Sequence, residues 1–132
     1  MNRRKMITGL SLLAGGVAFP AGAAQSGNAP VKGFSHHVFF WLKDPKNAQV
    51  RKKFQEGLQK LVTVDEIVEF HLGVPASTNR DVVVNTYTYS LLLFFKDKAD
   101  QDIYQTHPTH LKFIEECSAL WEKVEVYDTV PF

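Results

Sequence analysis

The sequence predicts an α+β fold, namely a ferredoxin-like subunit with the element order β-α-β-β-α-β and a four-stranded antiparallel sheet. Three observations predict it. Four segments are rich in Val, Phe, Tyr and Trp, as strands are. Two further regions repeat apolar residues every three or four positions, as amphipathic helices do. These segments follow one another in the order of that fold over residues 33–132.

The composition narrows the classes of function. The 132 residues suit one domain, and 45% hydrophobic against 22% charged residues is typical of a soluble globular protein. Fifteen Lys and Arg against fourteen Asp and Glu give a net charge of +1, which excludes a nucleic-acid binder driven by basic charge. One cysteine excludes an internal disulfide framework and a cysteine-based zinc cage. No apolar run is long enough for an ordinary membrane-spanning helix.

Residues 1–24 have the pattern of a cleavable export signal peptide: a basic start, an apolar stretch and an exit of small residues. The pair Arg3-Arg4 resembles a twin-arginine signal, and the general secretory route is the alternative. The exit carries no cysteine for a lipid anchor. We therefore expect a bacterial protein exported to the periplasm or secreted, with no membrane anchor after cleavage. Residues 25–32 are expected to form a linker, and residues 33–132 the folded domain.

The first strand is expected over Phe34–Lys43, where large apolar side chains stand on both faces. A helix is expected to follow at once, because Asp44 suits the N-cap and Pro45 suits the first helical position. Its apolar stripe runs from Val50 to Leu61 at spacings of three and four.

The second strand is expected over Ile67–Val74, followed by a turn-rich connection over Pro75–Asp81. Val82–Lys96 has the strongest strand pattern of the chain. A helical region begins at Asp97–Tyr104, is interrupted at Pro108, and continues over 109–119 with Leu111 turned inward. The last strand is expected over 121–129.

Two helices can cover only one face of such a sheet, yet the first and third strands are apolar on both faces. Phe39, Trp41, Leu92 and Phe94 would share one face, although the pattern does not decide which face the helices cover. Either face is too apolar to stay in water. The sequence therefore predicts a partner sheet and a homodimer formed through the sheet face.

The segment Tyr104-Gln-Thr-His107-Pro-Thr-His110 carries a titratable or hydrogen-bonding group at every third residue. Pro108 starts a helix, and a helix N-terminus favours neutral His110, the form that a general base needs. Tyr104 offers a phenol that can donate to a developing oxyanion. The alternative is structural, with a histidine that caps the helix and a tyrosine that bonds a carbonyl group.

The remaining histidines and the cysteine favour no metal chemistry. His36 and His37 point to opposite faces of a strand, and no helix carries a histidine pair four residues apart. We therefore expect neither a metal nor another cofactor, the alternative being a histidine site assembled across strands. Cys117 is expected to be a buried core thiol.

At these residues the chain resembles the stress-responsive A/B barrel domain (Dabb) family of the dimeric α/β-barrel superfamily. The most specific match is the Y-x-x-H-P-x-H segment, and the similarity spans residues 34–128. The other matching pieces are His36-His37-Val38-Phe39-Phe40, Leu72-Gly73, Leu111-Lys112-Phe113 and Trp121-Glu122-Lys123 to Tyr127-Asp128.

The resemblance implies a subunit whose sheet packs against that of a twin to close a dimeric α/β barrel. In the family's plant polyketide cyclase, olivetolic acid cyclase, a Tyr and a His of this segment do acid–base work in an aldol closure without a cofactor. Those catalytic roles fall on Tyr104 and His110, and a substrate-binding role falls on His36. A further pocket His falls where this chain has Tyr89. Tyr89 and the neighbouring His107 complete the expected substrate-binding set.

Three functions from different classes follow. The first is a pocket for a small apolar ligand with cofactor-free acid–base chemistry on a ketone-like or polyketide-like substrate. The second is a non-catalytic binder of an apolar ligand, and the third is a stress-protective structural dimer. A cavity where His36, Tyr104 and His110 converge would favour the first two over the third.

Overall fold

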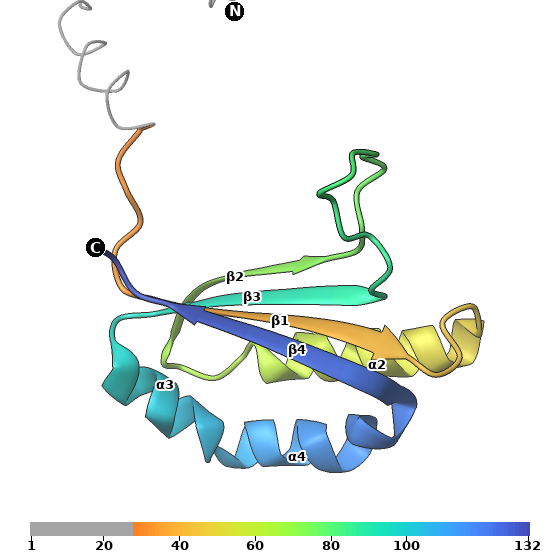
Figure 1. Cartoon of the computed structure of the whole chain (residues 1–132). Helices are drawn as coiled ribbons and strands as arrows, with labels where there is room; N and C mark the ends of the chain where they lie inside the picture. The colour runs from red at the N-terminus through yellow and green to blue at the C-terminus, as the bar shows by residue number, and fades with distance from the viewer. Residues whose placement is uncertain (1–27) are drawn as a thin grey trace, which may run out of the picture. The chain divides into compact units, whose positions relative to one another are not determined.

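In the computed structural model, which describes residues 28–132, four antiparallel strands form one sheet and the helices cover one of its faces (Figure 1). The strand order is β2-β3-β1-β4, so the ferredoxin-like β-α-β-β-α-β fold is confirmed. The expected signal peptide lies outside the described residues. The elements are β1 (Phe34–Leu42), α2 (Ala48–Leu61), β2 (Ile67–Gly73), β3 (Tyr89–Phe95), α3 (Lys98–Gln105), α4 (Pro108–Cys117), η3 (Ser118–Leu120) and β4 (Trp121–Thr129).

The central strand β1 settles which residues face the helices. Its residues alternate between buried and half-buried along the whole strand, because successive side chains point to opposite faces. Those on the helix side are Phe34, His36, Val38, Phe40 and Leu42. Phe39 and Trp41 lie on the other face, together with Leu92 and Phe94 of β3, as the sequence predicts.

The core between the sheet and the helices is built around aromatic rings. Phe54 of α2 is fully buried and packs edge-on against Phe40 of β1 at a centroid distance of 5.0 Å. Phe113 of α4 lies 5.8 Å from Phe54. Helices α2 and α4 approach closely at Gly57, where a Cβ atom would lie 2.6 Å from Sγ of Cys117. Cys117 is buried there, as expected.

Two helix predictions need correction. Helix α2 begins at Ala48 rather than at Pro45, because Asn47 is the N-cap and its Oδ1 accepts from the backbone N–H groups of Gln49 and Val50. Leu111 of α4 is exposed, and Phe113 takes the inward position instead. Phe113 is the inward residue because its ring packs against Phe40 and Phe54 of the core.

The third strand is shorter than its sequence pattern predicts. It begins at Tyr89, and residues 82–88 belong to a long connection after β2. Strand β2 ends at Gly73, opposite Ser90, so residues before Tyr89 have no neighbouring strand to complete a ladder on that side. We call residues 74–88 the β2–β3 arm. The arm rises from the sheet on the side away from the helices (Figure 1).

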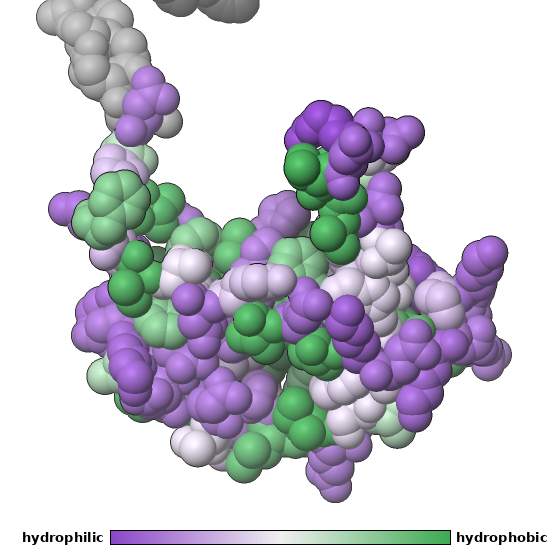
Figure 2. All heavy atoms as spheres, viewed as in Figure 1, coloured by the Kyte–Doolittle hydropathy of each residue, from purple (hydrophilic) through white to green (hydrophobic). Residues whose placement is uncertain are grey.

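The sheet face opposite the helices, the open face, has no covering element among residues 28–132. The β2–β3 arm stands at one end of it and carries hydrophobic atoms on its surface (Figure 2). Val82 is 82% exposed and Val84 66% exposed, and both line a hollow of about 270 Å³ with Phe39, Trp41, Tyr87, Glu125 and Tyr127. No helix in the described part of the chain is long and apolar enough to span a membrane.

Candidate active site

A cavity of about 160 Å³ opens between strands β1 and β4 and helices α3 and α4. Its mouth is marked by two apolar residues that remain exposed on the helix side, Ile114 and Val126, the latter 49% exposed. Three of the sequence-predicted residues line it, namely His36, Tyr104 and His110. The rest of the wall is largely apolar and includes Val38, Phe40, Leu61, Leu91, Phe113, Trp121 and Val124.

The break between α3 and α4 aims two of these side chains into one space. A residue before proline avoids the helical conformation, and His107 accordingly has a ψ of 139° ahead of Pro108. Helix α3 ends there, and Pro108 starts α4. Tyr104 comes from the last turn of α3 and His110 from the first turn of α4. Their ring centroids are 4.7 Å apart.

His110 is held as a neutral imidazole with a free Nε2. Its Nδ1 lies 3.0 Å from the carbonyl oxygen of Gln105, and since a carbonyl can only accept, Nδ1 carries the proton and donates. Burial lowers the pKa of His110 below its ordinary value, and the neighbouring His36 adds to the lowering, while the Gln105 carbonyl opposes it. Nε2 is therefore a lone-pair acceptor near pH 7.

Tyr104 keeps its phenolic proton at any physiological pH, because burial raises its pKa well above the ordinary range. No described side chain forms a hydrogen bond with its hydroxyl, and no buried polar side-chain atom among residues 28–132 lacks a partner. Its oxygen therefore reaches the cavity. A phenol in this state can donate to an oxygen that develops negative charge.

His36 is fixed by a carboxylate that sequence reasoning missed. Its Nδ1 donates to Oδ1 of Asp128 over 2.6 Å, across the pairing of β1 with β4. The His36 ring meets Tyr104 edge-on at 5.8 Å. The signal was present in the sequence, since Asp128 is an acidic residue in phase with Val124 and Val126 on the inward side of β4.

The structure places the two other predicted residues elsewhere. Nδ1 of His107 accepts from the backbone N–H of Thr109, 3.0 Å away, so this ring caps helix α4. Tyr89 lines a different cavity, under α2. Neither shares a cavity with Tyr104. Among residues 28–132 no group of three or more His, Cys, Asp or Glu side chains could hold a metal ion.

The size of the cavity limits what it can hold. An engineered cavity of about 150 Å³ binds benzene, so a space of about 160 Å³ suits a molecule or fragment the size of one six-membered ring. A base, a hydrogen-bond donor and a carboxylate-oriented imidazole stand around it. This set can remove a proton next to a carbonyl group and stabilise the resulting oxyanion.

Comparisons with known proteins agree with this architecture. The stress responsive A/B barrel domain family matches residues 34–131. No curated protein matches the chain. A Dabb family protein with a ferredoxin-like fold from Mesorhizobium loti is 25% identical, with a TM-score of 0.63 over 75% of this chain and 96% of its own.

Two other solved structures share the fold at lower identity. A dimeric ferredoxin-like protein of unknown function from Thermobifida fusca is 15% identical, with a TM-score of 0.62 over 79% of this chain and 97% of its own. A hydroxynitrile lyase from Passiflora edulis is 20% identical, with a TM-score of 0.64 over 78% of this chain and 96% of its own. At these identities the similarity shows the fold alone.

Proposed function

The chain belongs to the stress responsive A/B barrel domain family, and on this premise we propose that it binds a small ketone-like molecule and moves a proton on it without a cofactor. The observation that carries the proposal is the meeting of Tyr104 and His110 in one cavity, with ring centroids 4.7 Å apart. One is held as a donor and the other as an acceptor. A capping histidine and a bonded tyrosine would not need to share a cavity.

The proposed reaction is a proton abstraction next to a carbonyl group. Nε2 of His110 takes the proton from the α-carbon, and the electron pair of the broken C–H bond moves into an enolate. Tyr104 donates a hydrogen bond to the enolate oxygen. His36, oriented by Asp128, positions the substrate from the strand side. Return of the proton from His110 to the α-carbon completes the cycle. Where the enolate instead attacks a second carbonyl group, a C–C bond forms, and the proton of His110 goes to the new alkoxide oxygen and restores the neutral imidazole.

The fold is a suitable host for such chemistry. A structurally similar protein is a hydroxynitrile lyase, although at 20% identity its activity does not transfer to this chain. The wall of the cavity is mostly apolar, and a low dielectric strengthens hydrogen bonds to a developing charge. The cavity size favours the ketone-like substrate over a long polyketide chain lying wholly inside it.

The proposal includes a homodimer formed through the open face. Proteins of the same fold are described as dimeric. Phe39, Trp41, Leu92 and Phe94 lie on the open face, and a stable dimer would bury about 1,600 Å² there in total. The proposal also includes export of the mature domain through the pattern of residues 1–24.

Hydrogen–deuterium exchange at the α-carbon tests the function without knowledge of the natural substrate. Cyclohexanone, a ring-sized ketone, is incubated with the protein in D2O and followed by proton NMR. We expect catalysed exchange, and a fall of about 10²- to 10⁴-fold in His110→Gln, the range of a general base. His71→Gln is the matched control, because His71 is an exposed histidine outside the cavity.

The other outcomes separate the alternatives. Ketone binding without catalysed exchange would favour the non-catalytic ligand binder. Neither binding nor exchange with any ring-sized ketone would favour the stress-protective structural dimer. Full exchange in His110→Gln would remove this residue from the mechanism.

A further inference from the structure

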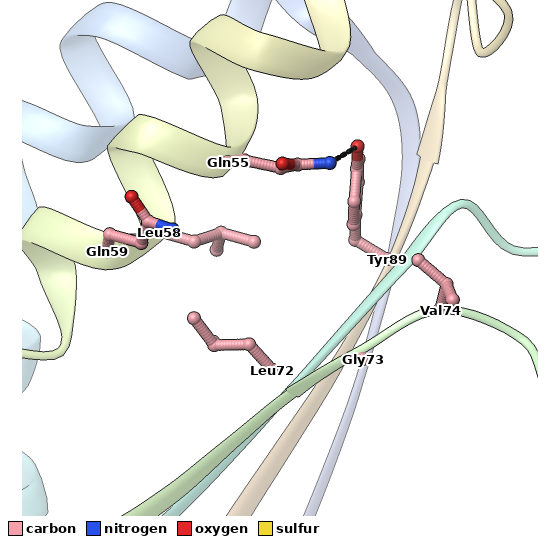
Figure 3. Close-up of a pocket in the computed structure, with 7 residues that line it drawn as sticks. All are labelled: Gln55, Leu58, Gln59, Leu72, Gly73, Val74 and Tyr89. Atoms are coloured by element: carbon pink, nitrogen blue, oxygen red, sulfur yellow. Dashed lines mark hydrogen bonds between the residues drawn. The ribbon is translucent and has the colours of Figure 1, made fainter.

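A second cavity, which we call the α2–β2 pocket, lies between helix α2 and the edge strand β2 (Figure 3). Its volume is about 300 Å³. Leu58 from α2 and Leu72 from β2 lie on opposite sides of the space, and Tyr89 and Gln55 point toward each other at one end (Figure 3). It is lined by Gln55, Leu58, Gln59, Leu72, Gly73, Val74 and Tyr89.

The pocket forms because the face of α2 that lies above the edge strand β2 is polar, whereas its neighbouring face is apolar. The buried stripe of α2 contains Phe54, Leu58 and Leu61 and packs toward the middle of the sheet. Gln55 and Gln59 are four residues apart and share the neighbouring face, which lies above β2. Apolar residues at these two positions would have extended the core. Two carboxamides instead leave the apolar floor of the pocket uncovered.

At the polar end of the pocket, the Tyr89 hydroxyl is a hydrogen-bond donor that no bond among the described residues uses. The Tyr89 side chain is buried, and Nε2 of Gln55 donates to its hydroxyl oxygen over 2.7 Å. This bond uses the hydroxyl as an acceptor, so its own hydrogen remains available. The hydrogen bonds found among residues 28–132 include none that this hydroxyl donates. A buried phenol ordinarily finds an acceptor.

The Tyr89 ring is held in place, so its hydroxyl has a fixed direction. It stacks on Phe54 at a centroid distance of 5.3 Å with an interplanar angle of 19°. The Arg51 guanidinium stands over the ring, 4.9 Å from its centroid. A donor fixed in this way orients a ligand at little entropic cost.

The α2–β2 pocket is separate from the candidate active site. The two cavities share no lining residue. Phe54 is fully buried beside both, stacked on Tyr89 and in edge contact with Phe40, which lines the active-site cavity. Phe54 therefore lies between a lining residue of one cavity and a lining residue of the other.

We propose that the α2–β2 pocket is a second binding site, for a neutral amphipathic molecule with a short alkyl chain and one hydrogen-bond-accepting oxygen. The chain lies between Leu58 and Leu72, and the oxygen accepts from the Tyr89 hydroxyl. Among the described residues no charged side chain lines the pocket, and the Arg51 guanidinium over the Tyr89 ring donates to the carbonyl oxygen of Pro45, so a carboxylate head group would have no cation in the lining to pair with. The volume is about twice that of a cavity that holds benzene, so a chain of about ten heavy atoms fits.

The probe for the test is nonan-2-one, and methyl NMR locates it. Titration should shift the methyl signals of Leu58 and Leu72, whereas binding in the active-site cavity would shift Ile114 and Val126. The methyl shifts and the ketone exchange assay are independent readouts. The absence of shifts at Leu58 and Leu72 would leave the proposed reaction standing, and the absence of ketone exchange would leave the α2–β2 binding site standing. Nonanoate, the anion of similar length, should bind more weakly than the ketone.

Two variants test the contacts. Tyr89→Phe keeps the stack on Phe54 but removes the donor, and should weaken nonan-2-one binding about 2- to 10-fold, the value of one hydrogen bond. Val74→Trp should block the pocket, because Val74 lines it and is 54% exposed. Ile103→Trp is its matched control, since Ile103 is 48% exposed on α3 and lines neither cavity.

Specific results would overturn the proposal. They are the absence of shifts at Leu58 and Leu72 with saturating ketone, unchanged affinity in Tyr89→Phe, or unchanged binding in Val74→Trp. Nonanoate binding as tightly as the ketone would overturn the assignment of a neutral ligand. Circular dichroism of each variant checks that the fold is intact.

Discussion

Phe39→Asp should dissociate the proposed homodimer. Phe39 lies on the central strand β1, on the open face, with Tyr87 4.9 Å and Tyr127 6.1 Å from its ring centroid. Burying a phenylalanine side chain contributes about 1.5–3 kcal/mol, and a two-fold interface contains the residue twice. Phe39 is already half-buried in the subunit, so association covers only the remaining half of each ring, and the loss of both rings removes about 1.5–3 kcal/mol of association free energy.

Converted at about 1.4 kcal/mol per factor of ten, this loss raises the dimer dissociation constant about 10- to 10²-fold. Desolvation of two unpaired carboxylates adds to it. The folded subunit should tolerate the change, because Phe39 is outside the core. The new carboxylate stands opposite Glu125 in the register of β1 and β4, a like-charge contact that costs the subunit about 0.2–1 kcal/mol.

Sedimentation equilibrium at micromolar concentration is the assay. The unsubstituted domain should sediment as a dimer and Phe39→Asp as a monomer with an unchanged circular dichroism spectrum. Ile103→Asp, which places the same charge on the helix side, should remain dimeric. A monomeric unsubstituted domain would show that the open face does not self-associate, and a dimeric Phe39→Asp would place the interface elsewhere.

Three further outcomes are expected. Asp128→Asn should lower the rate of ketone exchange about tenfold, because the charge-assisted bond that orients His36 is lost, and the NMR exchange assay measures it. Burial lowers the pKa of His110 in the folded chain, so the unfolded chain binds more protons below its ordinary pKa of 6.5. The free energy of unfolding, measured with urea, should therefore fall as the pH drops below 6.5 and through the lowered pKa, and less so in His110→Gln. Replacement of Arg3 and Arg4 by Lys should hold twin-arginine cargo in the cytoplasm, as cell fractionation would show, whereas unimpaired export would indicate the secretory route.

The fold was predictable because its strongest signals are local. The alternation along β1 and the break at Pro108 each follow from backbone geometry that one segment determines. The start of β3 was not predictable in this way. Residues 82–88 have a high strand propensity, but a strand needs a neighbour, and β2 ends at Gly73. Whether a neighbouring strand is present depends on the whole sheet, so the sequence of one segment does not reveal it.

The candidate site was predictable to a similar degree. The every-third-residue spacing of the segment, together with the family resemblance, predicted Tyr104 and His110 as site residues. The two side chains do meet in one cavity. The pairing of His36 with Asp128 was missed, because 92 residues separate the two and only the register of β1 with β4 joins them. The structural alternative stated for this segment, a histidine that caps the helix, applies to His107.

The two cavities have a common physical origin. Each occurs where a helix stops covering the sheet: the active-site cavity at the break before Pro108, and the α2–β2 pocket where Gln55 and Gln59 replace apolar residues. Between them Phe54 is fully buried among aromatic neighbours, so the core is complete where stability depends on it. The two cavities therefore lie at the margins of the sheet, where they leave the central packing of Phe54 against Phe40, Tyr89 and Phe113 intact.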